Sequence, residues 1–172
     1  VLSSSLNLIP GIKFNEDDKT VQKILDRVKE REFNGYSYDG ADASFELLVK
    51  KVLGEIPEFF SVQNFSVKVE KSGSEGETMS SAEVKLKIGP EEIIGTGSGV
   101  GPVNALDKAL RNNFESSGYS EVISDLSLID YKVRILNTGT DAITRVSIES
   151  TDSQGKNWFT IGVSPNIIAV SY

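Results

Sequence analysis

Two periodicities of apolar residues divide the chain, and the first is that of a helix. The first helical run consists of Val21, Ile24, Leu25 and Val28. It follows the acidic stretch 15–18 and stops before Asn34-Gly35, so a helix is predicted between them. A second helix is predicted from about Ala41 to Leu53, with Gly54 and Pro57 ending it. Its apolar positions are Phe45, Leu48, Val49 and Val52.

From Phe65 onward the period changes from 3.6 to 2, which is typical of half-buried strands. One strand is predicted from Phe65, Val67 and Val69, and the next from Ala82, Val84, Leu86 and Ile88. Residues 72–77 are expected to form a loop, and a short strand is expected around Ile93-Ile94. The glycine-rich stretch 95–101 is predicted to be a tight turn into a helix that begins at Pro102. One face of that helix carries Val103, Leu106, Leu110 and Phe114.

The same unit then recurs, which is the most informative feature of the sequence. Alternating residues predict strands at 131–135, 144–148 and 158–161. The segment Gly162-Val163-Ser164-Pro165 then repeats the pattern of Gly99-Val100-Gly101-Pro102. The predicted fold is therefore α+β: a helical subdomain over residues 1–60, then a duplicated βββα domain over 61–172 with pseudo-two-fold symmetry. The repeats span about 61–118 and 128–172, and the second helix is expected to be truncated.

Composition and charge exclude several functional classes. The 172 residues carry a formal net charge of −7 and include no Cys and no His. Because no block of Lys or Arg is present, no nucleic-acid or membrane partner is expected. Without Cys and His, the chain lacks thiolate sites, the usual general base and the commonest transition-metal ligand. No apolar run approaches the ~20 residues of a membrane span, and the chain starts without a basic flank, so a soluble cytoplasmic protein is predicted.

Two features remain as candidate chemistry. The glycines at 95, 97, 99 and 101 precede a helix N-terminus, which can bind an anion, although their spacing fits neither G-x-G-x-x-G nor a P-loop. Close packing in a tight strand-to-helix turn is the favoured explanation of the pattern; if a ligand is present, a small carboxylate would suit the site better than a nucleotide. Asp130, beside Tyr131 at the predicted start of a strand, is either a turn carboxylate or a ligand for a cation.

Four segments together resemble one enzyme family. They are 99–110 (GVGPVNALDKAL), 128–134 (LIDYKVR), 162–168 (GVSPNII) and 35–48 (GYSYDGADASFELL). The chain resembles, over essentially all its length, the C-terminal region of the 2-isopropylmalate and citramalate synthases, with the last segment most similar to the citramalate branch. The resemblance implies a linker subdomain and a regulatory domain that forms a homodimer and binds a branched-chain amino acid. It also implies that catalysis, a divalent metal and acetyl-CoA belong to a barrel that this chain lacks, so no catalytic residue, metal site or cofactor is expected here.

The resemblance also implies which residues bind the effector. Carried onto this sequence, they are Gly99, Gly101, Val103, Asn104, Leu128, Tyr131, Ile135, Ala142, Thr144, Val146, Pro165 and Ile167. Their apolar members would form a wall for a branched side chain, and junction N–H groups would take the carboxylate. The ammonium group would be held by Asp130 or by backbone carbonyls.

Three functions follow from these observations. The first is an isoleucine-binding feedback and dimerisation domain of citramalate synthase, which transfers the acetyl group of acetyl-CoA to pyruvate. The second is the leucine-binding domain of 2-isopropylmalate synthase, because one methyl position separates the two effectors and contributes only ~1–3 kcal/mol of discrimination. The third is a purely structural dimerisation module.

Overall fold

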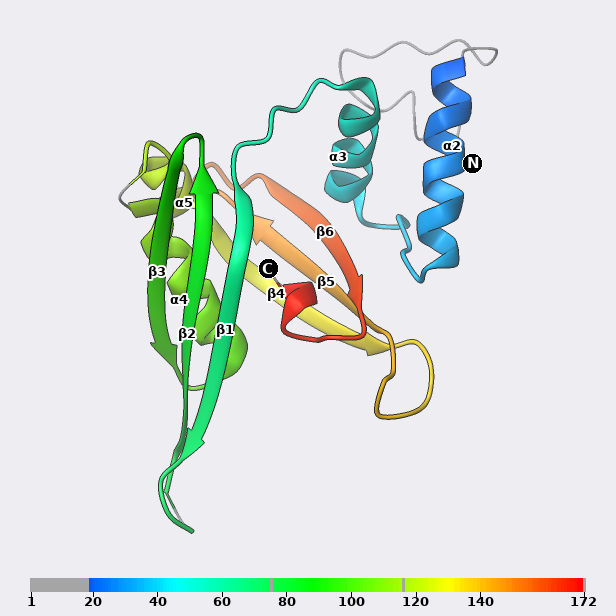
Figure 1. The fold of residues 1–172 in the computed structure, drawn as a ribbon. Helices are drawn as coiled ribbons and strands as arrows, with labels where there is room; N and C mark the ends of the chain where they lie inside the picture. The colour runs from blue at the N-terminus through cyan, green and yellow to red at the C-terminus, as the bar shows by residue number, and fades with distance from the viewer. Residues whose placement is uncertain (1–18, 75, 116, 172) are drawn as a thin grey trace. The chain divides into compact units, whose positions relative to one another are not determined.

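The computed structural model describes residues 19–171 except 75 and 116. Its helices are α2 (Lys19–Phe33), α3 (Asp42–Leu53), α4 (Pro102–Glu115), α5 (Ser120–Asp125) and the 3₁₀ helix η1 (Ala169–Ser171) (Figure 1). Its strands are β1 (Ser61–Lys71), β2 (Thr78–Ile88), β3 (Glu91–Gly99), β4 (Ser127–Ile135), β5 (Thr144–Thr151) and β6 (Asn157–Ser164). The α+β class is confirmed. The acidic stretch 15–18 lies outside the described residues.

Contacts divide the chain into two compact units. The first comprises the described residues up to Pro57 together with Leu128–Ser150 and Asn157–Val170. The second comprises Glu58–Ser127, Thr151–Lys156 and Ser171. This is a division by contacts, whereas the predicted boundary near residue 60 is a division along the chain and stays a prediction.

The helices α2 and α3 pack through the two apolar runs that the sequence indicates. The buried side chains of this cluster are Val21, Ile24, Val28, Phe45, Leu48 and Val49. The helix α3 ends at Gly54, whose φ of 71° allows its N–H to reach the carbonyl of Lys51 while Glu55 N–H reaches that of Lys50. Both predicted helices are confirmed to within a few residues.

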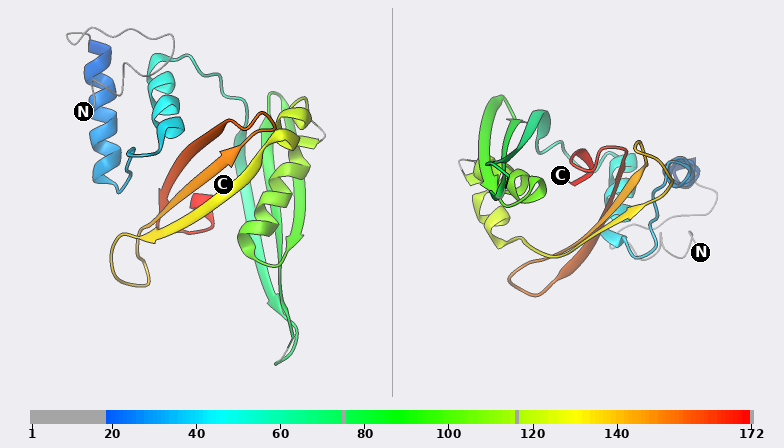
Figure 2. Two further views of the ribbon diagram at one scale, coloured as in Figure 1. Left: turned by 180° about the vertical axis from the view of Figure 1, so that it is seen from behind. Right: turned by 90° about the horizontal axis from the view of Figure 1, so that it is seen from below.

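In the second compact unit α4 covers one face of the antiparallel sheet β1-β2-β3 (Figure 2). The face of β2 that meets α4 is buried at Ala82, Val84 and Leu86, as the alternation predicts. The predicted turn over the glycine-rich stretch is wrong, because β3 continues through Gly99. Glycine at every second position of β3 lets the backbone of α4 approach closely: a Cβ at Gly95 would lie 2.7 Å from the Asn113 side chain.

The second sheet has the order β4-β5-β6, and its three strands confirm the second set of alternations. The predicted truncated second helix is present in the described residues only as a single short turn of 3₁₀ helix. After Ser164 the chain forms turns and then only the three-residue η1. The Asn166 side chain accepts hydrogen bonds from the N–H groups of Ile168 and Ala169, which is the N-cap arrangement of a helix start, and the helix continues in the described residues only as η1. The sequence pattern also missed the short helix α5.

Candidate functional site

The sheet β4-β5-β6 has two faces that differ in what covers them. One face carries Leu136 and Val163, which would lie 2.6 Å and 3.3 Å from a Cβ placed at Gly35, so we call it the Gly35 face. On the opposite face a Cβ at Gly162 would lie 2.8 Å from the Val170 side chain. This second face therefore carries η1, and we call it the η1 face. Strand alternation assigns every other residue of β4 and β5 to one face or the other.

Four of the predicted effector residues share the η1 face, namely Tyr131, Ile135, Thr144 and Val146. Thr144 and Val146 are buried, at 7% and 1% exposure, whereas Ile135 is 67% exposed. Ile129 and Val133 lie on the same face of β4 and are also exposed, at 50% and 43%. The face thus offers branched apolar side chains at its edge, beside a buried hydroxyl and valine on the central strand.

Leu128 and Asp130 alternate with these residues and so lie on the Gly35 face. Asp130 forms an ion pair with Lys132 on that face. The hydrogen bond from the Lys132 ammonium lowers the pKa of the Asp130 carboxyl below its ordinary value. Since the carboxylate faces away from Tyr131 and already has a cationic partner, it is not positioned to hold an ammonium group on the η1 face.

The second glycine–proline junction begins within β6, and the segment that follows it, with Pro165 and Ile167, leads into η1. Its conformation is set by one side-chain and one backbone hydrogen bond: the Ser164 hydroxyl accepts from Asn166 N–H at 3.0 Å, and Val170 N–H donates to the backbone carbonyl of Asn166 at 3.1 Å. Ala142 lies in the turn between β4 and β5, where Asn137 Oδ1 accepts from Ile143 N–H at 2.5 Å. These residues belong to the same compact unit as the η1 face.

The remaining predicted residues belong to the other compact unit. Gly99 ends β3, and a Cβ there would lie 3.0 Å from Ala105 N and close to the Asn104 side chain. Ala105 N–H donates to the carbonyl of Gly101 at 3.0 Å, which closes the first turn of α4. Nothing lies within 4 Å of a Cβ at Gly101, so that position is open. Val103 and Asn104 occupy the first turn of α4.

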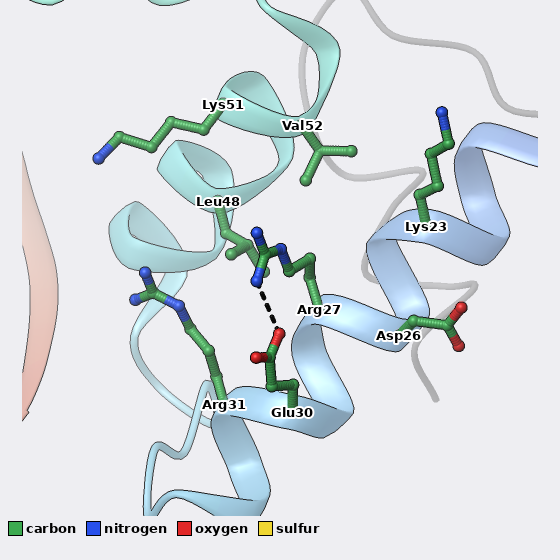
Figure 3. A pocket seen from close by; sticks show the side chains of 8 residues that line it. All are labelled: Lys23, Asp26, Arg27, Glu30, Arg31, Leu48, Lys51 and Val52. Carbon is green, nitrogen blue, oxygen red and sulfur yellow. Dashed lines mark hydrogen bonds and ion pairs between the residues drawn. The ribbon is translucent and has the colours of Figure 1, made fainter.

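A separate groove of about 580 Å³ lies between α2 and α3 (Figure 3). It is lined by Lys23, Asp26, Arg27, Glu30, Arg31, Leu48, Lys51 and Val52. Arg27 extends from α2 toward α3, where its guanidinium donates to Glu30 at 2.7 Å, and Asp26 points away from α3. Six of the eight lining residues are charged, and the other two are the apolar Leu48 and Val52. None of the predicted effector residues line the groove.

Arg145 and Ser44 are two further residues that the sequence reasoning missed. Arg145 Nε donates to the carbonyl of Gly35 at 2.7 Å, and Ile161 N–H donates to the Ser44 hydroxyl at 2.9 Å. The partners are 110 and 117 positions apart in the sequence, so no local pattern could indicate them. Strand alternation could have shown only that Arg145 faces away from Thr144 and Val146.

Two structural absences complete the description of the site. In residues 19–171, apart from 75 and 116, no group of three or more His, Cys, Asp or Glu side chains is arranged to hold a metal ion. Within the same described residues, no helix is both long and apolar enough to cross a membrane.

The two three-stranded antiparallel sheets and the helices that accompany them give the chain an α+β fold. The chain belongs to the LeuA allosteric (dimerisation) domain family, whose profile matches residues 39–172. It is 42% identical over 164 residues to the (R)-citramalate synthase of Geobacter sulfurreducens, which covers 94% of this chain and 30% of that protein. It is 42% identical over 165 residues to the (R)-citramalate synthase of Streptomyces coelicolor and 39% identical over 164 residues to that of Aquifex aeolicus, with the same two coverages. The chain thus spans about 30% of the length of these relatives.

Proposed function

We propose that the chain is the feedback-inhibition and dimerisation domain of a citramalate synthase and that it binds isoleucine on the η1 face of the β4-β5-β6 sheet. The observation that carries this proposal is the common placement of Tyr131, Ile135, Thr144 and Val146 on one face. A branched aliphatic side chain fits the apolar edge formed by residues such as Ile135. The backbone N–H groups of the second glycine–proline junction, which belongs to the same compact unit, supply donors for the carboxylate.

Backbone carbonyls, rather than Asp130, are the better acceptors for the ammonium group of the effector. Asp130 lies on the Gly35 face and is paired with Lys132. A carboxylate that already has a cationic partner gains little from a second one. The proposed site therefore omits Asp130 from direct contact and keeps the apolar wall.

The parent protein is proposed to be a cytoplasmic acyltransferase that condenses acetyl-CoA with pyruvate. Its divalent metal and its catalytic residues would lie in a barrel outside this chain, and this chain would act on that barrel as a homodimeric regulator. The names and lengths of the relatives support this proposal, since the matched region is only 30% of each. Incubation of the chain with acetyl-CoA and pyruvate should release no free CoA. Release of CoA would contradict the proposal that catalysis belongs to a barrel outside this chain.

Calorimetric titration with isoleucine, leucine and valine, together with the solution mass, tests the function directly. Heat of binding with isoleucine but not with leucine or valine, together with the solution mass of a dimer, would support the proposal. Heat with leucine alone would favour a 2-isopropylmalate synthase, and no heat from a folded dimer would favour a structural module. The relatives' names favour a citramalate synthase over a 2-isopropylmalate synthase.

A variant pair connects the binding to the η1 face. Ile135→Thr removes apolar contact from an exposed position, so isoleucine affinity should fall about tenfold without loss of folding. Ile94→Thr is the matched control, because Ile94 is 58% exposed in β3 on the face away from α4. Equal affinity of the two variants would remove the η1 face from the site.

A further inference from the structure

Two hydrogen bonds join the second sheet to the helical part of the same compact unit. Arg145 Nε in β5 donates to the carbonyl of Gly35 at 2.7 Å, and Ile161 N–H in β6 donates to the Ser44 hydroxyl at 2.9 Å. Gly35 lies just beyond the end of α2, and Ser44 lies in the first turn of α3. The sheet is therefore tied to both helices, at the point where one ends and the other begins.

Arg145 is placed so that its backbone and its side chain serve different faces. Its sequence neighbours Thr144 and Val146 lie on the η1 face, where the effector is proposed to bind. Its own side chain reaches the Gly35 face. A shift of β5 caused by contact with Thr144 or Val146 must therefore move the Arg145 guanidinium as well.

The segment around Gly35 is packed in a way that transmits such a shift. Gly35 has a φ of +100°, and a Cβ there would lie 2.6 Å from Leu136 Cδ1, so backbone and sheet are in close contact. Gly35 N–H donates to Glu32 at 3.0 Å and Tyr36 N–H donates to Arg31 at 3.0 Å, which attaches the segment to the last turn of α2. The Arg31 guanidinium also lies 4.8 Å from the centre of the Tyr36 ring.

We propose that Arg145 and Ser44 are positioning residues that carry the effector signal from the η1 face to helices α2 and α3. This inference rests on the proposed function, since it names the route by which that site regulates. Neither residue contacts the effector. When isoleucine holds β5 and β6 in one arrangement, the two hydrogen bonds hold the Gly35 segment and the start of α3 in the matching one.

Amide hydrogen exchange on the chain itself, with and without saturating isoleucine, tests the route. The reporters are the N–H groups of Asn34, Gly35 and Tyr36, which donate to carbonyls of α2 at 3.2, 3.0 and 3.0 Å. In the wild-type chain isoleucine should slow their exchange by about fivefold or more, the lower end of typical coupling between sites. In Arg145→Gln the slowing should disappear while the calorimetric Kd for isoleucine stays within about threefold, because the variant alters coupling rather than binding.

Three further variants separate coupling from a general effect on folding. Arg134→Gln is the matched control, since alternation places exposed Arg134 on the same face and it makes no hydrogen bond to α2 or α3 in the described residues. It should retain the full isoleucine-dependent slowing. Arg145→Lys should restore part of the slowing because it keeps a donor, and Ser44→Ala should reduce the slowing through the second contact.

The outcomes distinguish failure of the proposed function from failure of the coupling route alone. No isoleucine heat in the wild-type chain would refute the proposed function, and the coupling route with it. Isoleucine heat without slower exchange around Gly35 would refute the route alone. The route would also be refuted if Arg145→Gln kept the isoleucine-dependent slowing of exchange, or if Arg134→Gln lost that slowing as well.

Discussion

Replacement of Gly95 by alanine measures how much the close approach of β3 and α4 contributes to stability. A Cβ at position 95 would lie 2.7 Å from both Cγ and Nδ2 of Asn113 and would also meet the carbonyl oxygen of Ala109. Asn113 is fully buried, and its Nδ2 donates to the carbonyls of Val84 at 3.0 Å and Ala109 at 3.2 Å. The added methyl must therefore displace either the helix backbone or a buried amide that links α4 to β2.

The expected loss can be assembled from three contributions. Overpacking costs about 1–3 kcal/mol, and disruption of the buried amide's hydrogen bonds adds about 1–3 kcal/mol. Lower chain entropy in the unfolded state offsets roughly 0.4–1 kcal/mol of this. The free energy of unfolding should thus fall by about 1–6 kcal/mol.

Urea unfolding followed by circular dichroism gives the free energy, and Gly118→Ala supplies the matched control. Nothing lies within 4 Å of a Cβ at Gly118, so this variant should be neutral or slightly stabilised. Exchange of the β2 amides should report the same loss in Gly95→Ala. If the two alanine variants agree within about 0.5 kcal/mol, close packing is not the reason for glycine in β3.

Three other outcomes are expected from contacts and charges in the structure. Arg111→Ala should lower the free energy of unfolding by about 1–3 kcal/mol and speed amide exchange in α5. The reason is that Arg111 Nη1 donates to two carbonyls at the end of that helix, each at 3.0 Å. Unchanged amide exchange in α5 would contradict this prediction. Lys132→Gln should raise the Asp130 pKa toward its ordinary value in a carboxyl NMR titration, because the ion pair favours the charged carboxylate. The stability that this ion pair contributes is present above the unfolded pKa of Asp130 and is lost as the pH falls through the lower folded pKa. The wild type should lose stability as the pH rises above about 10, because burial raises the Tyr38 pKa and the native state then resists an ionisation that the unfolded chain undergoes. Denaturant titrations of Tyr38→Phe should show that this loss is removed. An identical alkaline loss in both proteins would show that another group is responsible.

The sequence determined the elements whose apolar residues repeat regularly. The helices α2, α3 and α4 and the strands of both sheets follow from periods of 3.6 and 2, since such repeats report which side of an element avoids water. The same alternation already implied that Asp130 and Tyr131 face opposite sides of β4, although the chemical reasoning placed both near one ligand. The four residues that share the η1 face were reached through the family resemblance, and their binding role stays a prediction.

The tertiary structure decided the features that depend on what packs against an element. Glycines 95, 97 and 99 read as a turn because glycine breaks local patterns, yet they form a strand because α4 approaches that face of the sheet. The second junction predicts a helix start, and Asn166 does cap one, yet in the described residues it continues only as the three-residue η1. The partners of Arg145 and Ser44 lie more than a hundred residues away. Periodicity shows which side of an element is apolar, whereas the segment that packs on that side is determined only by the tertiary packing of segments that are distant in the sequence.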